Sequence, residues 1–278
     1  MFGNATSIRA DEDERILVNI SVREPIEALS DYVYCSQLSS SWISKNLNSC
    51  LFSCLNSWKT DVLKIWYFGR TSSGLVRNEG NMIITVASFK GGVAKTTSAV
   101  HLAAYLKAQG SVILIDGDPN RSATGWAKRG RLPFEVVDER QAPYHLVNHK
   151  PDHIVIDTQA RPSEEDLQNL VRGDLLILPT TPDALALDAL FQTVLVLKKL
   201  DATKFRILLS IVPPKPRKTG ERAKEALESQ GLPLFKHWIR RFACYETAAL
   251  EGCPVYEVKD RNAGIAWKDY QQICKELL

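Results

Sequence analysis

The sequence has no long run of apolar residues and no strong net charge. Charged residues interrupt the apolar stretches well short of the roughly 20 residues of a membrane-spanning helix, so we expect no membrane span. Residues 1–30 contain no apolar core of the signal-peptide kind, and we therefore expect a cytoplasmic protein. The formal net charge is only +3 over 278 residues, so any binding to nucleic acid needs a local basic patch.

Cysteine is scarce, and its pattern does not indicate a disulfide framework. Six cysteines are scattered along 278 residues. Cys50 and Cys54 lie four residues apart, which would suit half of a metal site, but no histidine occurs among the first 80 residues. We therefore expect free thiols rather than a metal centre.

Methionine occurs only twice, and the second one, Met82, marks a change in pattern. Residues 1–81 show weak periodicity and no motif, whereas residues 82–278 are dense in pattern. We interpret residues 1–81 as an irregular N-terminal extension that is either poorly ordered or an artefact of a start site upstream of Met82. The alternative is an extension that binds a partner.

From Met82 onward, apolar strand-like runs alternate with helical periodicity. Such alternation predicts βαβ units, and hence an α/β fold with a doubly wound, mostly parallel sheet flanked by helices. The expected strands are 83–87, 111–115, 134–137, 154–156, 174–178 and 205–212. The expected helices are 96–109, 183–200, 219–229, 242–251 and 263–277.

The first expected strand leads into a glycine-rich loop, a lysine-threonine pair and a helix. This is the context of a phosphate-binding P-loop, because glycines let backbone N–H groups turn toward an anion and the helix N-terminus adds positive charge. We expect Lys95 to reach the β- and γ-phosphates, Thr96 to bind Mg²⁺ and Thr97 to reach the α-phosphate. Phe89 and Ala94 stand where the usual consensus has glycine.

The same loop resembles the deviant Walker A box, K-G-G-x-x-K-[ST], of the ParA/MinD superfamily of ATPases. It reads Lys90-Gly91-Gly92-Val93-Ala94-Lys95-Thr96-Thr97. Residues 113–120 resemble the family's second box, an apolar strand ending in D-x-D-P, and residues 153–158 resemble its Walker B strand. A C-terminal stretch, residues 240–267, resembles the ParA tail. The resemblance covers residues 82–278 and implies a P-loop NTPase fold that binds ATP and Mg²⁺.

The resemblance also implies a role for each charged residue of the site. Two subunits of the family sandwich two ATP molecules, and Lys90 matches the lysine that reaches the partner's nucleotide, so we expect an ATP-dependent homodimer. Asp118 matches the carboxylate that orients the attacking water, which with Lys90 and Lys95 makes up the expected catalytic set. Asp116 and Asp157 match the two aspartates near Mg²⁺.

Adenine recognition is less clearly marked. Pro213 and Pro214, which follow the last expected strand, are candidates for apolar stacking on the base, as the resemblance implies, but they are equally explained as strand terminators.

The resemblance leaves three branches of the family to be separated. The iron-protein branch needs cysteines after the phosphate-site strands, and residues 82–243 contain none. A MinD-like protein needs an amphipathic membrane-targeting tail, whereas the C-terminal residues here are polar and of mixed charge. The ParA branch binds DNA without sequence preference through a basic surface.

A basic segment fits the ParA branch. Residues 215–241 carry eight lysines and arginines against three glutamates. The expected DNA contacts are Lys215, Lys218, Arg240 and Arg241, although a solvated helix with ion pairs at i, i+4 would show the same residues.

Together these features predict a nucleoid-associated partition or positioning ATPase. In this interpretation the ATP-bound dimer coats DNA nonspecifically, and a ParB-like or other cargo adaptor stimulates hydrolysis and release. The cargo would be a plasmid, a chromosome or an organelle. The alternatives are a nucleotide-gated interaction switch with little turnover and a MinD-like, membrane-associated positioning ATPase.

Overall fold

The computed structural model describes residues 4–10, 16–21, 32–34, 81–162, 164–171 and 173–277. The chain divides into two compact units, Met1–Lys59 and Thr60–Leu278, and each is described by itself. In the first unit, strands β1 (Asn4–Ala10), β2 (Ile16–Ser21) and β3 (Tyr32–Tyr34) pair antiparallel in the order β1-β2-β3. Cys50 and Cys54, considered above as a metal half-site, lie outside the described residues.

The second unit is built on a six-stranded parallel sheet. Its order is β6-β5-β7-β4-β8-β9, so the chain reverses its direction of winding after β6 and places β4 in the interior of the sheet. The strands are β4 (Ile83–Ser88), β5 (Val112–Gly117), β6 (Glu135–Asp138), β7 (His153–Ala160), β8 (Leu175–Thr180) and β9 (Phe205–Leu209). Ligands of such sheets bind at the carboxyl ends of the strands, where the winding reverses.

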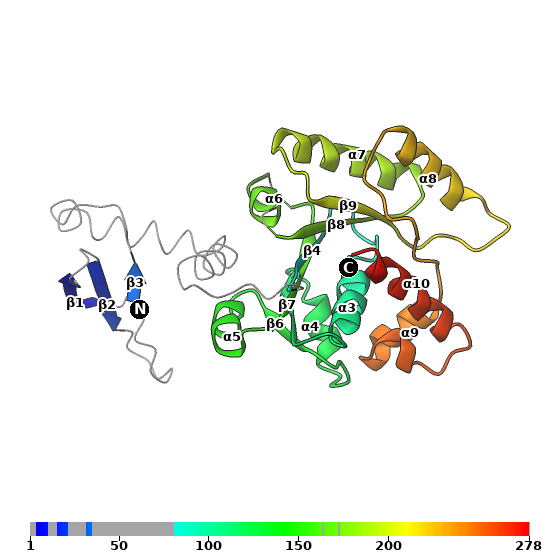
Figure 1. The fold of residues 1–278 in the computed structure, drawn as a ribbon. Coiled ribbons are helices and arrows are strands. Elements are labelled where there is room, and N and C mark those ends of the chain that lie inside the picture. The colour runs from blue at the N-terminus through cyan, green and yellow to red at the C-terminus, as the bar shows by residue number, and fades with distance from the viewer. Residues whose placement is uncertain are drawn as a thin grey trace. The chain divides into compact units, whose positions relative to one another are not determined.

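Helices cover both faces of this sheet (Figure 1). They are α3 (Lys95–Leu106), α4 (Ser122–Ala127), α5 (Ala142–His149), α6 (Glu164–Leu170), α7 (Ala184–Lys199), α8 (Thr219–Ser229), α9 (Cys244–Glu251) and α10 (Ala263–Lys275), with a short 3₁₀ turn at Val255–Glu257. None of the helices among the described residues is long and apolar enough to cross a membrane.

The sheet has a hydrophobic core on each of its two faces, because side chains alternate in direction along every strand. Successive strand side chains point to opposite faces, so neighbours such as Ile83 and Ile84 enter different clusters. Ile84, Leu114 and Val155 pack under α3, α4, α9 and α10, whereas Ile83 and Ile113 pack with Leu146 of α5. A third cluster joins β8 and β9 to α6, α7 and α8. Continuous apolar strands are buried on both faces, as the sequence predicts for a parallel sheet.

The predicted α/β architecture is confirmed, and most element boundaries agree to within a few residues. The clearest differences are three helices that the sequence pattern did not predict, namely α4, α5 and α6, all of eight residues or fewer. Helices this short carry too few turns to show a clear 3.6-residue period. The last predicted strand ends at Leu209, earlier than the expected Val212.

Candidate functional site

The predicted phosphate loop joins β4 in the interior of the sheet to the N-terminus of α3. Gly92 has φ of +76°, a conformation that glycine adopts without steric cost. Ala94 has φ of +63° and immediately precedes the helix. No side chain caps α3 and its first turn contains no acidic residue, so the backbone N–H groups at this end are directed toward the loop. Such a helix end attracts an anion.

Lys95, the first residue of α3, is nearly buried, with 7% of its surface exposed. Burial lowers the pKa of its ammonium group, while the nearby carboxylates of Asp157 and Asp118 act in the opposite direction. A cation and acidic groups therefore share a weakly hydrated site at the carboxyl ends of the strands. This arrangement suits a ligand that brings its own negative charge and a counter-cation.

Asp157 of β7 is the acidic residue whose surroundings best fit a metal ion. Its side chain is fully buried, and neither carboxylate oxygen forms a hydrogen bond among the described residues. Burial raises its pKa to about 7; Thr96 and Lys95 counteract this shift, and Asp116 and Asp118 reinforce it. A buried carboxylate with so little hydrogen bonding is costly unless a cation is bound, so Asp157 and the neighbouring Thr96 hydroxyl fit Mg²⁺.

Asp116, at the end of β5, is engaged differently from Asp157. Its Oδ2 atom accepts hydrogen bonds from the backbone N–H of Thr124 at 2.8 Å and from the Thr124 hydroxyl at 2.7 Å. Its Oδ1 atom accepts from the backbone N–H of Asp118 at 3.2 Å. Because both oxygens hold the chain together, the expected metal role of Asp116 stays a prediction, and it suits contact through water better than direct ligation.

Asp118 lies one residue beyond β5 and is held by its own turn. Its Oδ1 atom accepts from the backbone N–H of Asn120 at 2.9 Å and from the Asn120 amide at 3.0 Å. Between the two aspartates, Gly117 passes so close to β7 that a Cβ atom there would lie 3.0 Å from the carbonyl oxygen of Asp157. A glycine at this position lets the carboxylates of neighbouring strands meet at one edge of the sheet.

Lys90 is turned toward its own subunit. Its Nζ atom lies 2.8 Å from Oδ1 of Asp183, the residue that caps α7 by accepting from the backbone N–H of Ala186 at 3.0 Å. Burial opposes ionisation of Asp183, but hydrogen bonds from Lys90, Thr181 and Ala186 outweigh it and lower the pKa of the carboxyl group. Both members of the pair are partly exposed, so their attraction is weak and the lysine can leave.

Two residues that support the loop were not found by sequence reasoning. The hydroxyl of Ser210 donates to the carbonyl oxygen of Val93 at 2.9 Å, which ties the phosphate loop to the end of β9. Asp183 caps α7, and the only sequence signal was its place at the start of an expected helix. A serine more than 100 residues from the loop carries no local signal, because the fold alone brings the two together.

The candidate adenine residues lie where β9 leaves the sheet. Pro213 is partly buried and Pro214 is exposed. Nearby, the backbone of residues 233–241 runs parallel to the end of β9, with bridges from Ile207 to Leu234 and from Val212 to Arg240. Ile211, with φ of +52°, interrupts the extended backbone and explains the early end of β9. The segment brings the residues that follow Val212 beside the Arg240–Arg241 pair. The adenine role of the two prolines stays a prediction.

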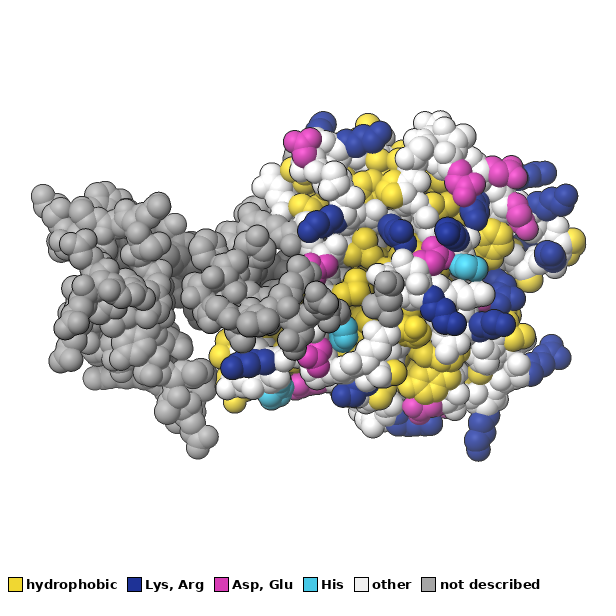
Figure 2. Space-filling model, in the orientation of Figure 1, with side chains coloured by type: hydrophobic (Ala, Val, Ile, Leu, Met, Phe, Trp, Pro, Cys, Tyr) yellow, Lys and Arg dark blue, Asp and Glu magenta, His cyan; other side chains and the backbone are white. Residues whose placement is uncertain are grey.

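The four candidate DNA contacts separate into two kinds. Lys215, Lys218 and Arg241 are exposed and form no ion pair among the described residues. Arg240 instead forms a bidentate pair with the buried Asp269 of α10, with Nη2 to Oδ1 at 2.5 Å and Nε to Oδ2 at 3.0 Å. On the face shown in Figure 2, lysine and arginine side chains gather around α8 and the loop that precedes it. The structure therefore gives Arg240 a structural partner and leaves the other three available.

Comparison with known proteins agrees with this geometry. Residues 84–255 match the model of the CobQ/CobB/MinD/ParA nucleotide binding domain. The chain is 36% identical over 202 residues to a protein named Maintenance of carboxysome distribution protein A from Gloeobacter kilaueensis, covering 70% of this chain and 93% of that protein. It is 28% identical over 207 residues to a protein of the same name from Halothiobacillus neapolitanus, covering 70% of this chain and 95% of that one.

A solved structure shares the fold. The structure of a Cyanothece McdA variant in complex with ATP superimposes with a TM-score of 0.57 at 18% identity, covering 70% of this chain and 96% of that one. At this identity the match concerns the fold alone.

Proposed function

The chain belongs to the CobQ/CobB/MinD/ParA family of nucleotide-binding domains, and from that premise we propose that it is a positioning ATPase of the ParA type. One observation carries the proposal. A buried lysine, Lys95, and two carboxylates, Asp118 and Asp157, gather beside an uncapped helix N-terminus at the carboxyl edge of the sheet. This combination suits binding and hydrolysis of a nucleoside triphosphate with its metal ion.

Each residue has a distinct task in this mechanism. The backbone N–H groups of residues 91–97 and the ammonium group of Lys95 bind and orient the phosphates. Thr96 and Asp157 hold Mg²⁺, which neutralises phosphate charge when it is bound. Asn120 holds one oxygen of Asp118, which leaves the second oxygen to orient a water for attack on the γ-phosphate.

Dimerisation is coupled to the nucleotide through Lys90. In the structure this lysine is paired with Asp183 of its own chain, and the pair is weak and partly exposed. Triphosphates on two facing chains would offer each Lys90 a stronger anionic partner, so ATP would favour an ATP-bound sandwich dimer. Hydrolysis removes that charge and returns the chain to the monomer.

The proposed dimer binds DNA nonspecifically through Lys215, Lys218 and Arg241, and so associates with the nucleoid. A cargo adaptor then stimulates hydrolysis and release. The similarity to two carboxysome distribution proteins along most of their length favours an organelle as cargo over a plasmid or a chromosome. The membrane-associated alternative needs a free amphipathic tail, whereas Ala266, Tyr270 and Ile273 on the apolar face of α10 are packed in the core.

The test compares two variants with the parent. Asp118→Ala should bind ATP and dimerise but hydrolyse at least about 100-fold more slowly, because the attacking water loses its acceptor. Lys90→Ala should bind ATP and stay monomeric. Light scattering after size exclusion and phosphate release, each with ATP and with ADP, give the two readouts. Normal turnover by Asp118→Ala, or ATP-dependent dimers of Lys90→Ala, would contradict the mechanism.

A further inference from the structure

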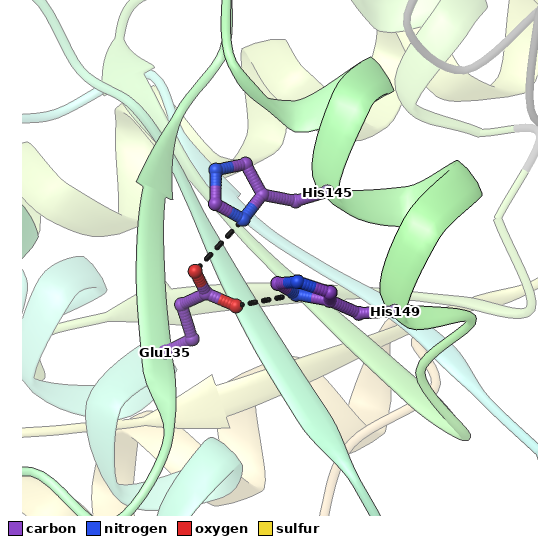
Figure 3. Close-up of side chains that lie close together, drawn as sticks. All are labelled: Glu135, His145 and His149. Atoms are coloured by element: carbon purple, nitrogen blue, oxygen red, sulfur yellow. Dashed lines mark hydrogen bonds and ion pairs between the residues drawn. The ribbon is translucent and has the colours of Figure 1, made fainter.

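A second cluster of ligand-type side chains lies outside the nucleotide site. Glu135 opens β6, and His145 and His149 lie on α5 (Figure 3). Glu135 pairs in register with Ile113, three residues before Asp116, so the cluster lies about 10 Å along the strands from the phosphate edge. The catalytic mechanism above does not use these three residues.

The spacing of the two histidines directs them to one face of the helix. Residues i and i+4 of an α-helix are neighbours on its surface, so both imidazole rings face the strand. Their ring centroids are 5.2 Å apart. The His145 Nδ1 atom lies 2.7 Å from Oε1 of Glu135, and the His149 Nδ1 atom lies 2.9 Å from Oε2. One ligand atom from each residue falls within 4.8 Å of the others.

Both histidines already pair with Glu135. The His149 Nδ1 atom forms a hydrogen bond with Oε2 at 2.9 Å, whereas the buried His145 Nδ1 atom lies 2.7 Å from Oε1 but lacks the geometry of a hydrogen bond. Two imidazoles and one carboxylate form the His₂Glu donor set that binds Zn²⁺ and similar cations. Tetrahedral ligands with bonds of 2.0–2.1 Å lie about 3.3 Å apart, so ligand atoms within 4.8 Å of one another would adjust by at most about 1.5 Å to admit the ion.

We propose that Glu135, His145 and His149 form a binding site for a zinc-class divalent transition-metal ion, with water completing its shell. The ion joins α5 to β6, a strand at the edge of the sheet. Tyr144 and Val147 of α5 are 56% and 64% exposed. A bound ion would therefore stabilise the position of a helix that presents apolar side chains to solvent.

The experiment uses the full-length chain without nucleotide, after a chelator has removed bound metal. Excess Mg²⁺ is present so that it occupies sites made of oxygen ligands, such as the proposed phosphate site. Zn²⁺ is titrated by calorimetry, and Co²⁺ serves as the spectroscopic probe. We expect one Zn²⁺ per chain and a Co²⁺ spectrum of tetrahedral type without thiolate charge transfer. Zn²⁺ should also raise the melting temperature, because it binds the folded chain.

Three variants decide the assignment. His145→Asn and His149→Asn should each weaken Zn²⁺ binding by about 100-fold or more, since even changes behind a metal ligand cost 10–100-fold. His237→Asn is the matched control, because His237 forms a histidine-glutamate pair with Glu276 but has no third ligand among the described residues. Unchanged Zn²⁺ affinity in both α5 variants, absence of binding by the parent, or a thiolate band in the Co²⁺ spectrum would overturn the proposal.

Discussion

At the scale of single residues, the phosphate loop contains a strained position. Ala94 adopts φ of +63° and ψ of +35°, the left-handed region that costs a residue with a Cβ atom about 1–2 kcal/mol. The first turn of α3 cannot relieve this strain without moving Lys95, which is buried between acidic groups. The loop therefore keeps a phosphate-binding conformation at some cost in stability.

Ala94→Gly should stabilise the protein by about 0.5–1 kcal/mol, because glycine adopts the left-handed region freely. ATP affinity should not change, since the backbone N–H groups stay in place. Urea unfolding without nucleotide measures the difference. The matched control is Ala226→Gly at an exposed position of α8, which should cost about 1 kcal/mol. Destabilisation by both substitutions would contradict the strain argument.

At the scale of elements, His101 joins α3 to the C-terminal segment. The ring is fully buried and stacks on Tyr270 of α10 with ring centroids 4.7 Å apart. Its Nδ1 atom donates to the carbonyl oxygen of Thr97 at 2.6 Å, and its Nε2 atom accepts from the backbone N–H of Val255 at 3.1 Å. The bond from Val255 needs the neutral ring, because a protonated Nε2 atom cannot accept, whereas the bond to Thr97 forms in either protonation state. Burial accordingly lowers the pKa of His101 to about 4.

Because of this histidine, the free energy of unfolding should decrease as the pH is lowered. The unfolded chain takes up the proton near pH 6.5 and the folded chain only near pH 4, so the contribution is complete above pH 6.5 and is lost as the pH falls toward 4. About 3 kcal/mol is involved, at 1.36 kcal/mol per pKa unit. The contribution of Asp157 to stability changes with pH in the opposite direction, because its pKa is raised in the folded chain and protonation therefore favours folding.

The difference between the parent and His101→Gln separates the two effects, because Asp157 is common to both proteins. The stability advantage of the parent should shrink between pH 7 and pH 4.5, as measured by urea unfolding. An advantage that stays constant over this range would show that folding does not lower the pKa of this ring.

At the scale of the whole molecule, one edge of the sheet collects the functional groups. The proposed nucleotide site lies at the carboxyl ends of β4, β5 and β7. The segment 233–241 runs along β9, whose end leads into Pro213 and the loop with Lys215 and Lys218. Arg240 anchors this segment to α10 through Asp269, so the basic loop and the C-terminal helix belong to one connected body. The basic loop and the proposed nucleotide site therefore lie on the same side of the sheet, at the carboxyl ends of its strands.

Lys215→Glu with Arg241→Glu should lower the affinity of the ATP-bound protein for nonspecific DNA. The salt dependence should flatten by about one slope unit for each phosphate that the variant no longer neutralises. ATP hydrolysis without DNA should be unchanged. Fluorescence anisotropy over a range of salt concentrations measures both the affinity and its slope. The control is Lys107→Glu with Lys204→Glu, which reverses two exposed charges on the opposite side of the sheet, at the amino ends of the strands. This variant should retain the parent's affinity for DNA.

Arg240→Glu makes a separate prediction. Removing the guanidinium leaves the buried Asp269 with only the backbone N–H of Arg240, so the cost should appear as about 2–3 kcal/mol of stability rather than as a specific loss of DNA binding. Chemical unfolding of Arg240→Glu and Arg241→Glu side by side distinguishes a structural arginine from a surface arginine. Equal stability of the two variants would contradict the structural role of Arg240 and favour its role as a DNA contact.

The sequence by itself determined the α/β architecture, and it marked the proposed phosphate loop and its three acidic residues, because each is expressed locally as a strand, a turn or a short motif. The tertiary structure alone decided which charges are partnered. Lys90 contacts Asp183, Arg240 contacts Asp269, and Glu135 meets two histidines of α5. These pairs join residues 10 to 93 positions apart. Whether a charged side chain is paired or free to bind a ligand depends on its burial and on its distance from other charges. The packing around the sheet sets both quantities, and no local pattern of residues encodes them.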